Sequence, residues 1–189
     1  MARHDEYMQA NRSAAISFQD RSQPKKHWTP PADGFLKLNA DGSFLPSIPY
    51  GGTGGVIRDS HGQFIAGFSC RMEFVSSPLH IELLALKNGL ELLQAMQITR
   101  AVVESDCLLA VQAINLTVGE LSSLSALITD LQSLLAATTE VELYFVPRQA
   151  NVVAHRLASC SYESNINVDW FVNAPKFISD ALMYDFHRI

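Results

Sequence analysis

Three carboxylates stand out because of the segments beside them. Asp41 and Asp106 each follow a run that is typical of a β-strand, and Glu82 lies inside the most apolar helical segment of the chain. Carboxylates held close together repel one another, and a hard cation relieves that repulsion. Oxygen ligands without cysteine favour Mg²⁺ or Mn²⁺ over zinc. If the fold brings the three together, they form a divalent-cation site.

Each carboxylate also has an explanation that involves no ligand. Asp41 precedes Gly42 and Ser43, so it could simply shape a turn. Asp106 could cap the helix expected after it. Glu82 stands near a helix start, where the macrodipole favours a solvated negative charge. The functional interpretation therefore depends on whether the three side chains meet.

The helix that carries Glu82 is clearly marked. Ser77 and Pro78 suit an N-cap followed by the first helical position. Leucines at spacings of three and four residues predict a face turned to the core: Leu79, Leu83, Leu86, Leu90 and Leu93. Glu82 then lies at the edge of that face, within the first turns.

The remaining elements are predicted from alternation, turn residues and helical spacing. Strands are expected at 35–41, 56–58, 63–71, 100–104 and 141–146, and further helices at 107–114, 121–137 and 151–160. The glycines at 51–55 lead into a strand, and no Lys-Ser/Thr pair follows them, which argues against a phosphate-binding loop. We interpret them as places where two backbones approach closely, or as the site of a bulge.

The predicted order is three strands, a helix, a strand, two helices, a strand and a final helix. It predicts an α/β fold with a mixed five-stranded sheet and helices on both faces. A helical crossover implies that strands 35–41 and 100–104 run parallel. Ligands gather at the carboxyl ends of such strands, so Asp41 and Asp106 should lie side by side, within reach of Glu82. Two cations held about 3.5–4 Å apart by carboxylates support phosphodiester cleavage.

Length and composition set the frame. The 189 residues suit one domain with a sizeable core, predicted at 28–163, after a flexible leader at 1–27. The tail at 164–189 is expected to pack on that domain. We expect a monomer, and no membrane span, because no run of about 18 apolar residues occurs. Whether the leader is a true N-terminus or the remnant of a longer polyprotein stays open.

Charge and cysteine content bear on partners and compartment. Three widely separated cysteines suit a reducing, intracellular setting, and the nucleus and the cytoplasm both stay open. The net charge of −5 counts against nucleic-acid binding through phosphates. A nucleic-acid function would therefore need a local basic strip or bound cations.

Taken together, the motifs resemble the ribonuclease H-like domain of the plant reverse-transcriptase-associated type. The resemblance runs from about Trp28 to the end of the chain. It is carried by Trp28, Pro31, residues 37–43, 54–59, 82–86, 104–106 and 146–148, Asn151, Ala154, His155, Leu157, Ala158, Trp170, Pro175 and Asp185.

The resemblance implies cleavage within the RNA strand of an RNA–DNA hybrid, with water as nucleophile and Mg²⁺, or alternatively Mn²⁺, as cofactor. It implies that Asp41, Glu82 and Asp106 bind metal, with His155 at a fourth position. Candidate substrate-binding residues are Ser43, Arg148 and Asn151.

Two departures from the family pattern keep other functions open. His155 stands where well-studied ribonucleases H have a fourth carboxylate, and an imidazole suits Mn²⁺ better than Mg²⁺. The segment 146–151 is too short for the loop that often carries a mobile histidine. The alternatives are a weakly active or inactive domain from a mobile element that serves nucleic-acid binding or assembly, and another nuclease of this fold. His155 could also be only a half-buried helix residue.

Overall fold

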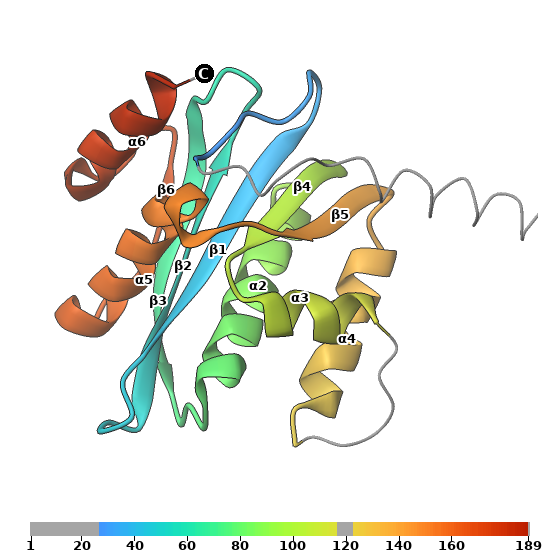
Figure 1. Ribbon diagram of the computed structural model, residues 1–189, viewed down its shortest axis with the longest axis vertical. Helices are drawn as coiled ribbons and strands as arrows, with labels where there is room; N and C mark the ends of the chain where they lie inside the picture. The colour runs from blue at the N-terminus through green and yellow to red at the C-terminus, as the bar shows by residue number, and fades with distance from the viewer. Residues whose placement is uncertain (1–26, 117–122, 189) are drawn as a thin grey trace, which may run out of the picture.

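The computed structural model describes residues 27–116 and 123–188 and contains one mixed sheet (Figure 1). Its strand order is β5-β4-β1-β2-β3-β6, so the α/β prediction is confirmed but the count of five strands is wrong. The strands are β1 Leu36–Phe44, β2 Tyr50–Arg58, β3 Phe64–Glu73, β4 Arg100–Ser105, β5 Glu140–Phe145 and β6 Asn167–Phe171. The unpredicted strand is β6, a short edge strand in which only alternate residues are partly covered.

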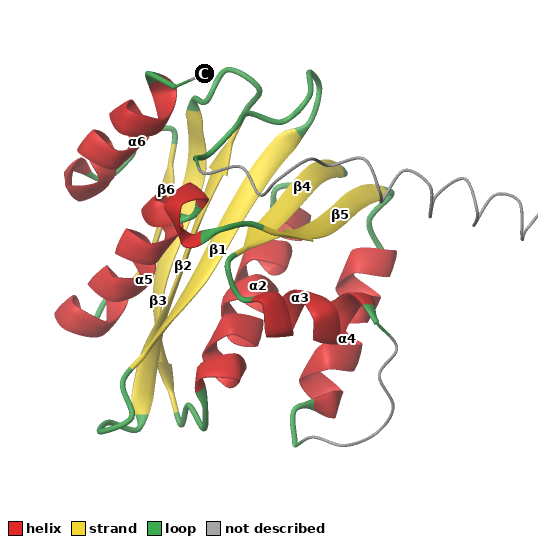
Figure 2. Cartoon of the chain, viewed as in Figure 1, coloured by secondary structure: helices red, strands yellow, loops and turns green. Residues whose placement is uncertain are grey.

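Helices cover both faces of the sheet, as predicted (Figure 2). One face carries α2 (Pro78–Ala95), α3 (Leu108–Asn115) and α4 (Ser125–Ala136). The other carries α5 (Val152–Ser164), with α6 (Ser179–Phe186) packed beside it. The helix predicted at 151–160 therefore runs further than expected and is not the final one. Two short 3-10 turns, η1 (Arg148–Ala150) and η2 (Lys176–Ile178), precede α5 and α6.

The central strand β1 runs parallel to β4 and antiparallel to β2. The predicted crossover is therefore confirmed. Pairing between β1 and β4 ends at Ala40 and Ser105, whereas β1 continues to Phe44. Asp41 consequently lies inside the strand, at the first position beyond its pairing with β4, so its interpretation as a turn residue is wrong.

The glycines of the second strand permit close packing. They belong to β2 itself, which begins at Tyr50 rather than after them. A Cβ on Gly54 would lie 2.1 Å from the backbone nitrogen of Ala158, and a Cβ on Gly55 would lie 2.3 Å from the Phe68 ring. Helix α5 therefore lies directly on the sheet, and the prediction of close backbone approach is confirmed.

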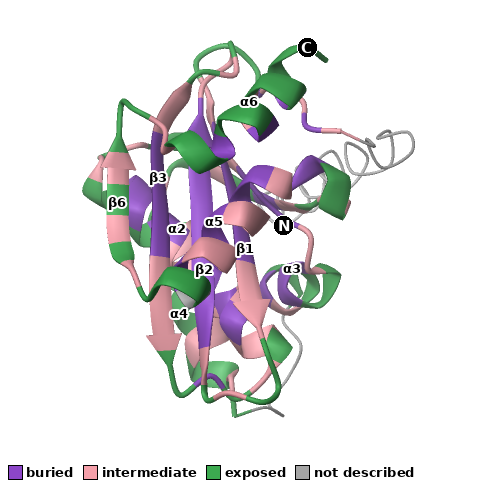
Figure 3. Cartoon of the chain, turned by 90° about the vertical axis from the view of Figure 1, so that its left-hand side faces the viewer, coloured by how far each residue is buried: buried purple, intermediate pink, exposed green. Residues whose placement is uncertain are grey.

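The core has two parts (Figure 3). The larger one fills the space between the sheet and α2, α3 and α4; Leu83, Leu86, Leu90 and Leu93 are buried in it, as predicted, and Leu79 is partly buried. The smaller one lies under α5 and α6 and contains Val56, Val153, Leu157, Ile178 and Ala181.

The C-terminal residues contribute to both sheet and core. Strand β6 pairs with β3, and α6 packs on α5. The predicted leader falls almost wholly outside the described residues, and the domain boundaries remain predictions. Among the described helices, none is both long and apolar enough to cross a bilayer.

Candidate metal centre

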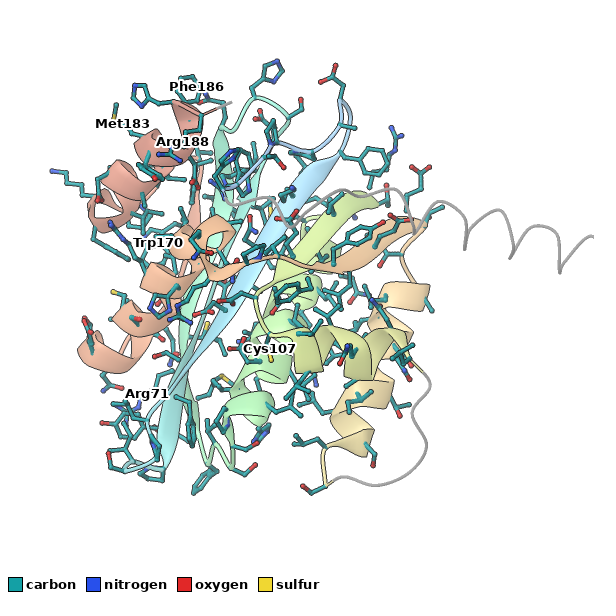
Figure 4. The ribbon with its side chains drawn as sticks, viewed as in Figure 1. Arg71, Cys107, Trp170, Met183, Phe186 and Arg188 are labelled. Carbon is teal, nitrogen blue, oxygen red and sulfur yellow. The ribbon has the colours of Figure 1, made fainter. Side chains whose placement is uncertain are left out.

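Three elements bring the carboxylates to one point. Asp41 lies on β1 just beyond its pairing with β4, Asp106 follows the last residue of β4, and Glu82 lies near the start of α2. One carboxylate oxygen from each lies within 4.8 Å of the others. The structure thus brings together the three residues that strand order predicts to meet. Cys107, which follows Asp106, marks the place near the middle of the molecule (Figure 4).

Gly42 explains how Glu82 reaches this point. A Cβ at Gly42 would lie 2.8 Å from the backbone nitrogen of Glu82, so only glycine lets α2 approach β1 this closely. The Gly42 N–H also donates a hydrogen bond to Glu82 Oε2 at 3.1 Å. At the helix start, Ser77 accepts a hydrogen bond from the His80 N–H, which confirms the predicted cap.

Asp41 is buried with one oxygen unsatisfied. Its side chain is 1% exposed, and Oδ2 lies 2.9 Å from His155 Nδ1. In the part of the chain that the structure describes, Oδ1 has no hydrogen-bond partner. Burial raises the pKa of Asp41 to about 6, although its hydrogen bond with His155 acts in the opposite direction. A buried carboxylate oxygen without a partner is costly, and a cation would satisfy it.

The pKa of Glu82 is raised further than that of Asp41. Burial, and then repulsion from Asp41 and Asp106, raise the pKa of Glu82 to about 9, and the hydrogen bond from Gly42 only partly opposes this. Burial and mutual repulsion therefore oppose the charged forms of Asp41 and Glu82, and added positive charge would favour them. Such unbalanced charge is typical of a site that binds cations.

Asn151 and Ser43 take different positions around the centre. Asn151 is 1% exposed, and its amide nitrogen donates to Ala40 O at 3.0 Å and to Asp106 Oδ1 at 2.9 Å. This placement favours holding Asp106 against β1 over direct contact with a substrate. Ser43 is partly exposed, two residues beyond Asp41 on the same strand.

Arg148 and His155 form the open side. The Arg148 side chain is 61% exposed, with Nη1 3.6 Å from Asp106 Oδ2. Its Nη2 lies 3.0 and 3.1 Å from the two ring nitrogens of His155. The His155 ring thus lies between Arg148 and Asp41, with its side chain 36% exposed. These contacts were not predicted from the sequence. The local feature that could have suggested them is the seven-residue spacing of Arg148 and His155, which lie on either side of the start of α5.

Cys107 does not suggest thiol chemistry. Burial raises the pKa of its thiol, and the nearby Glu82 and Asp106 act in the same direction. A protonated thiol is a poor nucleophile and a poor metal ligand. The chemistry of the centre therefore rests on oxygen ligands, with the His155 imidazole beside them.

Comparisons with known proteins agree with this architecture. A family model described as reverse transcriptase-like matches residues 39–161, which include every residue of the candidate site. An Arabidopsis thaliana protein named as a candidate ribonuclease H protein is 27% identical over 158 residues, covering 84% of this chain and 25% of the relative. The chain thus spans about a quarter of that relative's length.

Solved structures of ribonucleases H1 share the fold. The enzyme of the archaeon Halobacterium salinarum has a TM-score of 0.64 and 18% identity, covering 69% of this chain and 99% of that one. The LC11 enzyme, isolated from compost by a metagenomic approach and crystallised with an RNA/DNA hybrid, has a TM-score of 0.62 and 18% identity, covering 69% and 98%. The fold is ribonuclease H-like, and because the family model matches more than half of its length, the chain belongs to the reverse transcriptase-like family.

Proposed function

We propose that this protein is a metal-dependent endonuclease that hydrolyses the RNA strand of RNA–DNA hybrids. The observation that carries the proposal is the cluster of Asp41, Glu82 and Asp106 within 4.8 Å, with a buried Asp41 oxygen left without a partner in the described structure. If these three acids served only folding, replacing one of them would remove electrostatic repulsion and make the domain more stable.

The donor set fits Mg²⁺, with Mn²⁺ as the alternative, because the ligands are carboxylate oxygens. A pair of such cations, when bound, supplies an activated water and stabilises the leaving 3′ oxygen of the cleaved strand. Asp41, Glu82 and Asp106 would hold the cations. Asn151 keeps Asp106 in place through its 2.9 Å hydrogen bond.

Beside these three carboxylates, His155 would orient Asp41 and Arg148 would bind the substrate. His155 Nδ1, 2.9 Å from Asp41 Oδ2, holds that carboxylate in one orientation and stands at the fourth corner of the centre. The exposed Arg148 guanidinium is placed to donate hydrogen bonds to a phosphate next to the cleaved bond. Ser43 is a candidate for contact with the 2′-hydroxyl that distinguishes RNA from DNA.

The choice of a hybrid as substrate is supported by the family and its neighbours. The Arabidopsis relative is named as a candidate ribonuclease H protein, and the LC11 neighbour was crystallised with an RNA/DNA hybrid. A second candidate, a weakly active nucleic-acid-binding or assembly domain, is favoured by one contact. Arg148 already lies against His155 and Asp106, where it would compete with a cation for the same side of the centre.

Cleavage of an end-labelled RNA–DNA hybrid, assayed separately with Mg²⁺ and Mn²⁺, tests the proposal. We expect cut RNA from the wild type and none from Asp41→Asn, with a DNA–DNA duplex of the same sequence left intact. Equal product from wild type and Asp41→Asn with both metals would reject the enzyme in favour of the binding domain. Binding of the hybrid by both proteins in the same samples would show that the variant is folded.

A further inference from the structure

Positive charge is distributed unevenly along the chain. Residues 148–188 contain four Lys and Arg and four Asp and Glu, whereas residues 27–147 contain five and twelve. The five earlier cations are paired within the fold, two in buried ion pairs and three with carboxylates at the surface: Lys37, Arg58, Arg71, Lys87 and Arg100. Arg148 and Arg156 are also paired, so among the described residues the Lys and Arg that make no ion pair lie in this last part of the chain.

The acids of this last part neutralise few of its cations. Asp185 is buried and pairs with Arg58 at 2.8 Å. Glu163 lies at the far end of α5 and Asp169 on the edge strand β6. Only Asp180 meets one of the exposed cations, Arg156, at 2.5 Å, with both side chains open to solvent. Exposed ion pairs of this kind contribute little to stability, and the surface pairs of Arg71 and Arg100 are of the same kind.

One of these cations, Arg156, lines a hollow of about 400 Å³ between the start of α5 and α6. Gln149 and Tyr184 also line it, together with Asp180, which pairs with Arg156, and Asp185, which pairs with Arg58. Gln149 and Arg156 directly follow Arg148 and His155 of the centre. The Arg188 guanidinium lies 4.3 Å over the Tyr184 ring.

Lys176 lies next to a residue that Arg156 contacts. Arg156 also donates to the carbonyl of Phe177 at 3.4 Å, next to Lys176 on η2. Within the described residues, neither Lys176 nor Arg188 makes an ion pair. We call Arg156, Lys176, Tyr184 and Arg188 the C-terminal basic surface; Figure 4 shows Arg188 just beyond the end of α6.

The segment is held firmly enough to present these side chains. Ile178 and Ala181 are buried against α5, and the Asp185 carboxylate bonds to the buried Arg58. Arg156, Lys176 and Tyr184 are thus carried on α5, η2 and α6, which the core fixes, and Arg188 follows two residues after the end of α6.

We propose that the C-terminal basic surface binds the sugar–phosphate backbone of a nucleic-acid duplex that continues beyond the candidate metal centre. The proposal rests on the proposed function for its choice of partner. Lys and Arg side chains make most sequence-independent contacts with phosphates. The surface supplies the local basic strip that a chain of net charge −5 needs in order to hold such a partner.

Fluorescence anisotropy with a labelled RNA–DNA hybrid tests the surface in the full Asp41→Asn chain, where binding is measured without cleavage. We expect Lys176→Gln with Arg188→Gln to weaken binding about tenfold. The slope of log affinity against log salt should fall by roughly 0.9 for each phosphate that the variant no longer neutralises. The control is Arg71→Gln with Arg100→Gln, which removes the same charge on β3 and β4.

The outcomes separate cleanly. An unchanged affinity for Lys176→Gln with Arg188→Gln, or an equal loss in the control pair, overturns the surface. Cleavage by the wild type together with unchanged binding leaves the proposed function standing and rejects the inference. If binding weakens only in Lys176→Gln with Arg188→Gln and the wild type does not cleave, the inference stands and the proposed function is rejected. Thermal unfolding of each protein shows that all are folded.

Discussion

Lys37, Asn39 and Asp41 are alternate residues on one face of β1, yet the charges around the two ends of this series are arranged differently. Around Lys37 and Asn39, each buried charge has a partner of opposite sign. Around Asp41, buried charges of the same sign converge. A cluster whose buried charges balance one another therefore lies only two residues along β1 from a cluster whose charges do not.

The balanced cluster links distant parts of the chain. Lys37 pairs with Glu104 at 2.5 Å, and Glu104 also accepts from Asn39 at 2.9 Å. The indole of Trp28 donates to Asn39 at 2.9 Å, and the Arg58 guanidinium stacks 3.8 Å over its ring. Arg58 in turn pairs with Asp185, drawing the N-terminal and C-terminal parts of the described chain together.

Charge balance distinguishes the structural cluster around Lys37 and Asn39 from the functional cluster around Asp41. Buried ion pairs with satisfied hydrogen bonds are compatible with a fold that needs no ligand. Buried carboxylates with raised pKa values and an unsatisfied oxygen are tolerated at sites where a ligand supplies the missing charge. Removing a partner from the balanced cluster and removing repulsion from the carboxylate cluster should therefore change stability in opposite directions.

The largest expected effect is in the balanced cluster. Asp185→Ala leaves the Arg58 guanidinium buried without its carboxylate, which typically costs about 3–5 kcal/mol. Urea unfolding of wild type and variant measures the difference. Asp180→Ala on the same helix is the control, because its partner Arg156 is exposed. Equal stabilities of the two variants would show that the balanced cluster is not structural.

In the carboxylate cluster, removing charge should stabilise the metal-free protein. The folded pKa values of Asp41 and Glu82, about 6 and about 9, lie above those of the unfolded chain. The stability from their protonation is therefore present in acid and lost as pH rises through these values. Relative to Asp41→Asn with Glu82→Gln, the wild type should lose at least about 3 kcal/mol, the part due to Asp41 alone, between about pH 4 and about pH 9.

Urea unfolding in chelator, with both proteins at each pH, measures this difference and cancels the titration of other groups. A gap between the two proteins that stays constant with pH would mean that the carboxylates are not under electrostatic stress.

The sequence predicted the unbalanced cluster better than the balanced one. Asp41 and Asp106 could be brought together because strand order and the crossover rule place the ends of β1 and β4 side by side. Asp185 and Arg58 are 127 residues apart, and no local periodicity connects them. For the same reason β6 was missed, since five residues of weak alternation acquire meaning only through pairing with β3.

A divalent cation should reverse the instability of the carboxylate cluster. Mg²⁺ or Mn²⁺ at about a hundred times its dissociation constant should stabilise the wild type by about 2–3 kcal/mol. The effect should be larger at pH 8 than at pH 5, because protonated carboxylates do not bind cations. Thermal unfolding with and without the cation measures it. An equal shift in Asp41→Asn with Glu82→Gln would place the cation elsewhere.

The smallest effect concerns His155, whose ring lies against Asp41 on the open side of this centre. Its imidazole holds Asp41 without adding negative charge, and it suits Mn²⁺ better than Mg²⁺. His155→Asp should therefore raise Mg²⁺-dependent cleavage relative to Mn²⁺-dependent cleavage by up to about tenfold, within the usual range for changes around metal ligands. His155→Asn, which is similar in size but uncharged, should not. An unchanged ratio in His155→Asp would mean that His155 only orients Asp41, so that the cation preference is set by the three carboxylates alone.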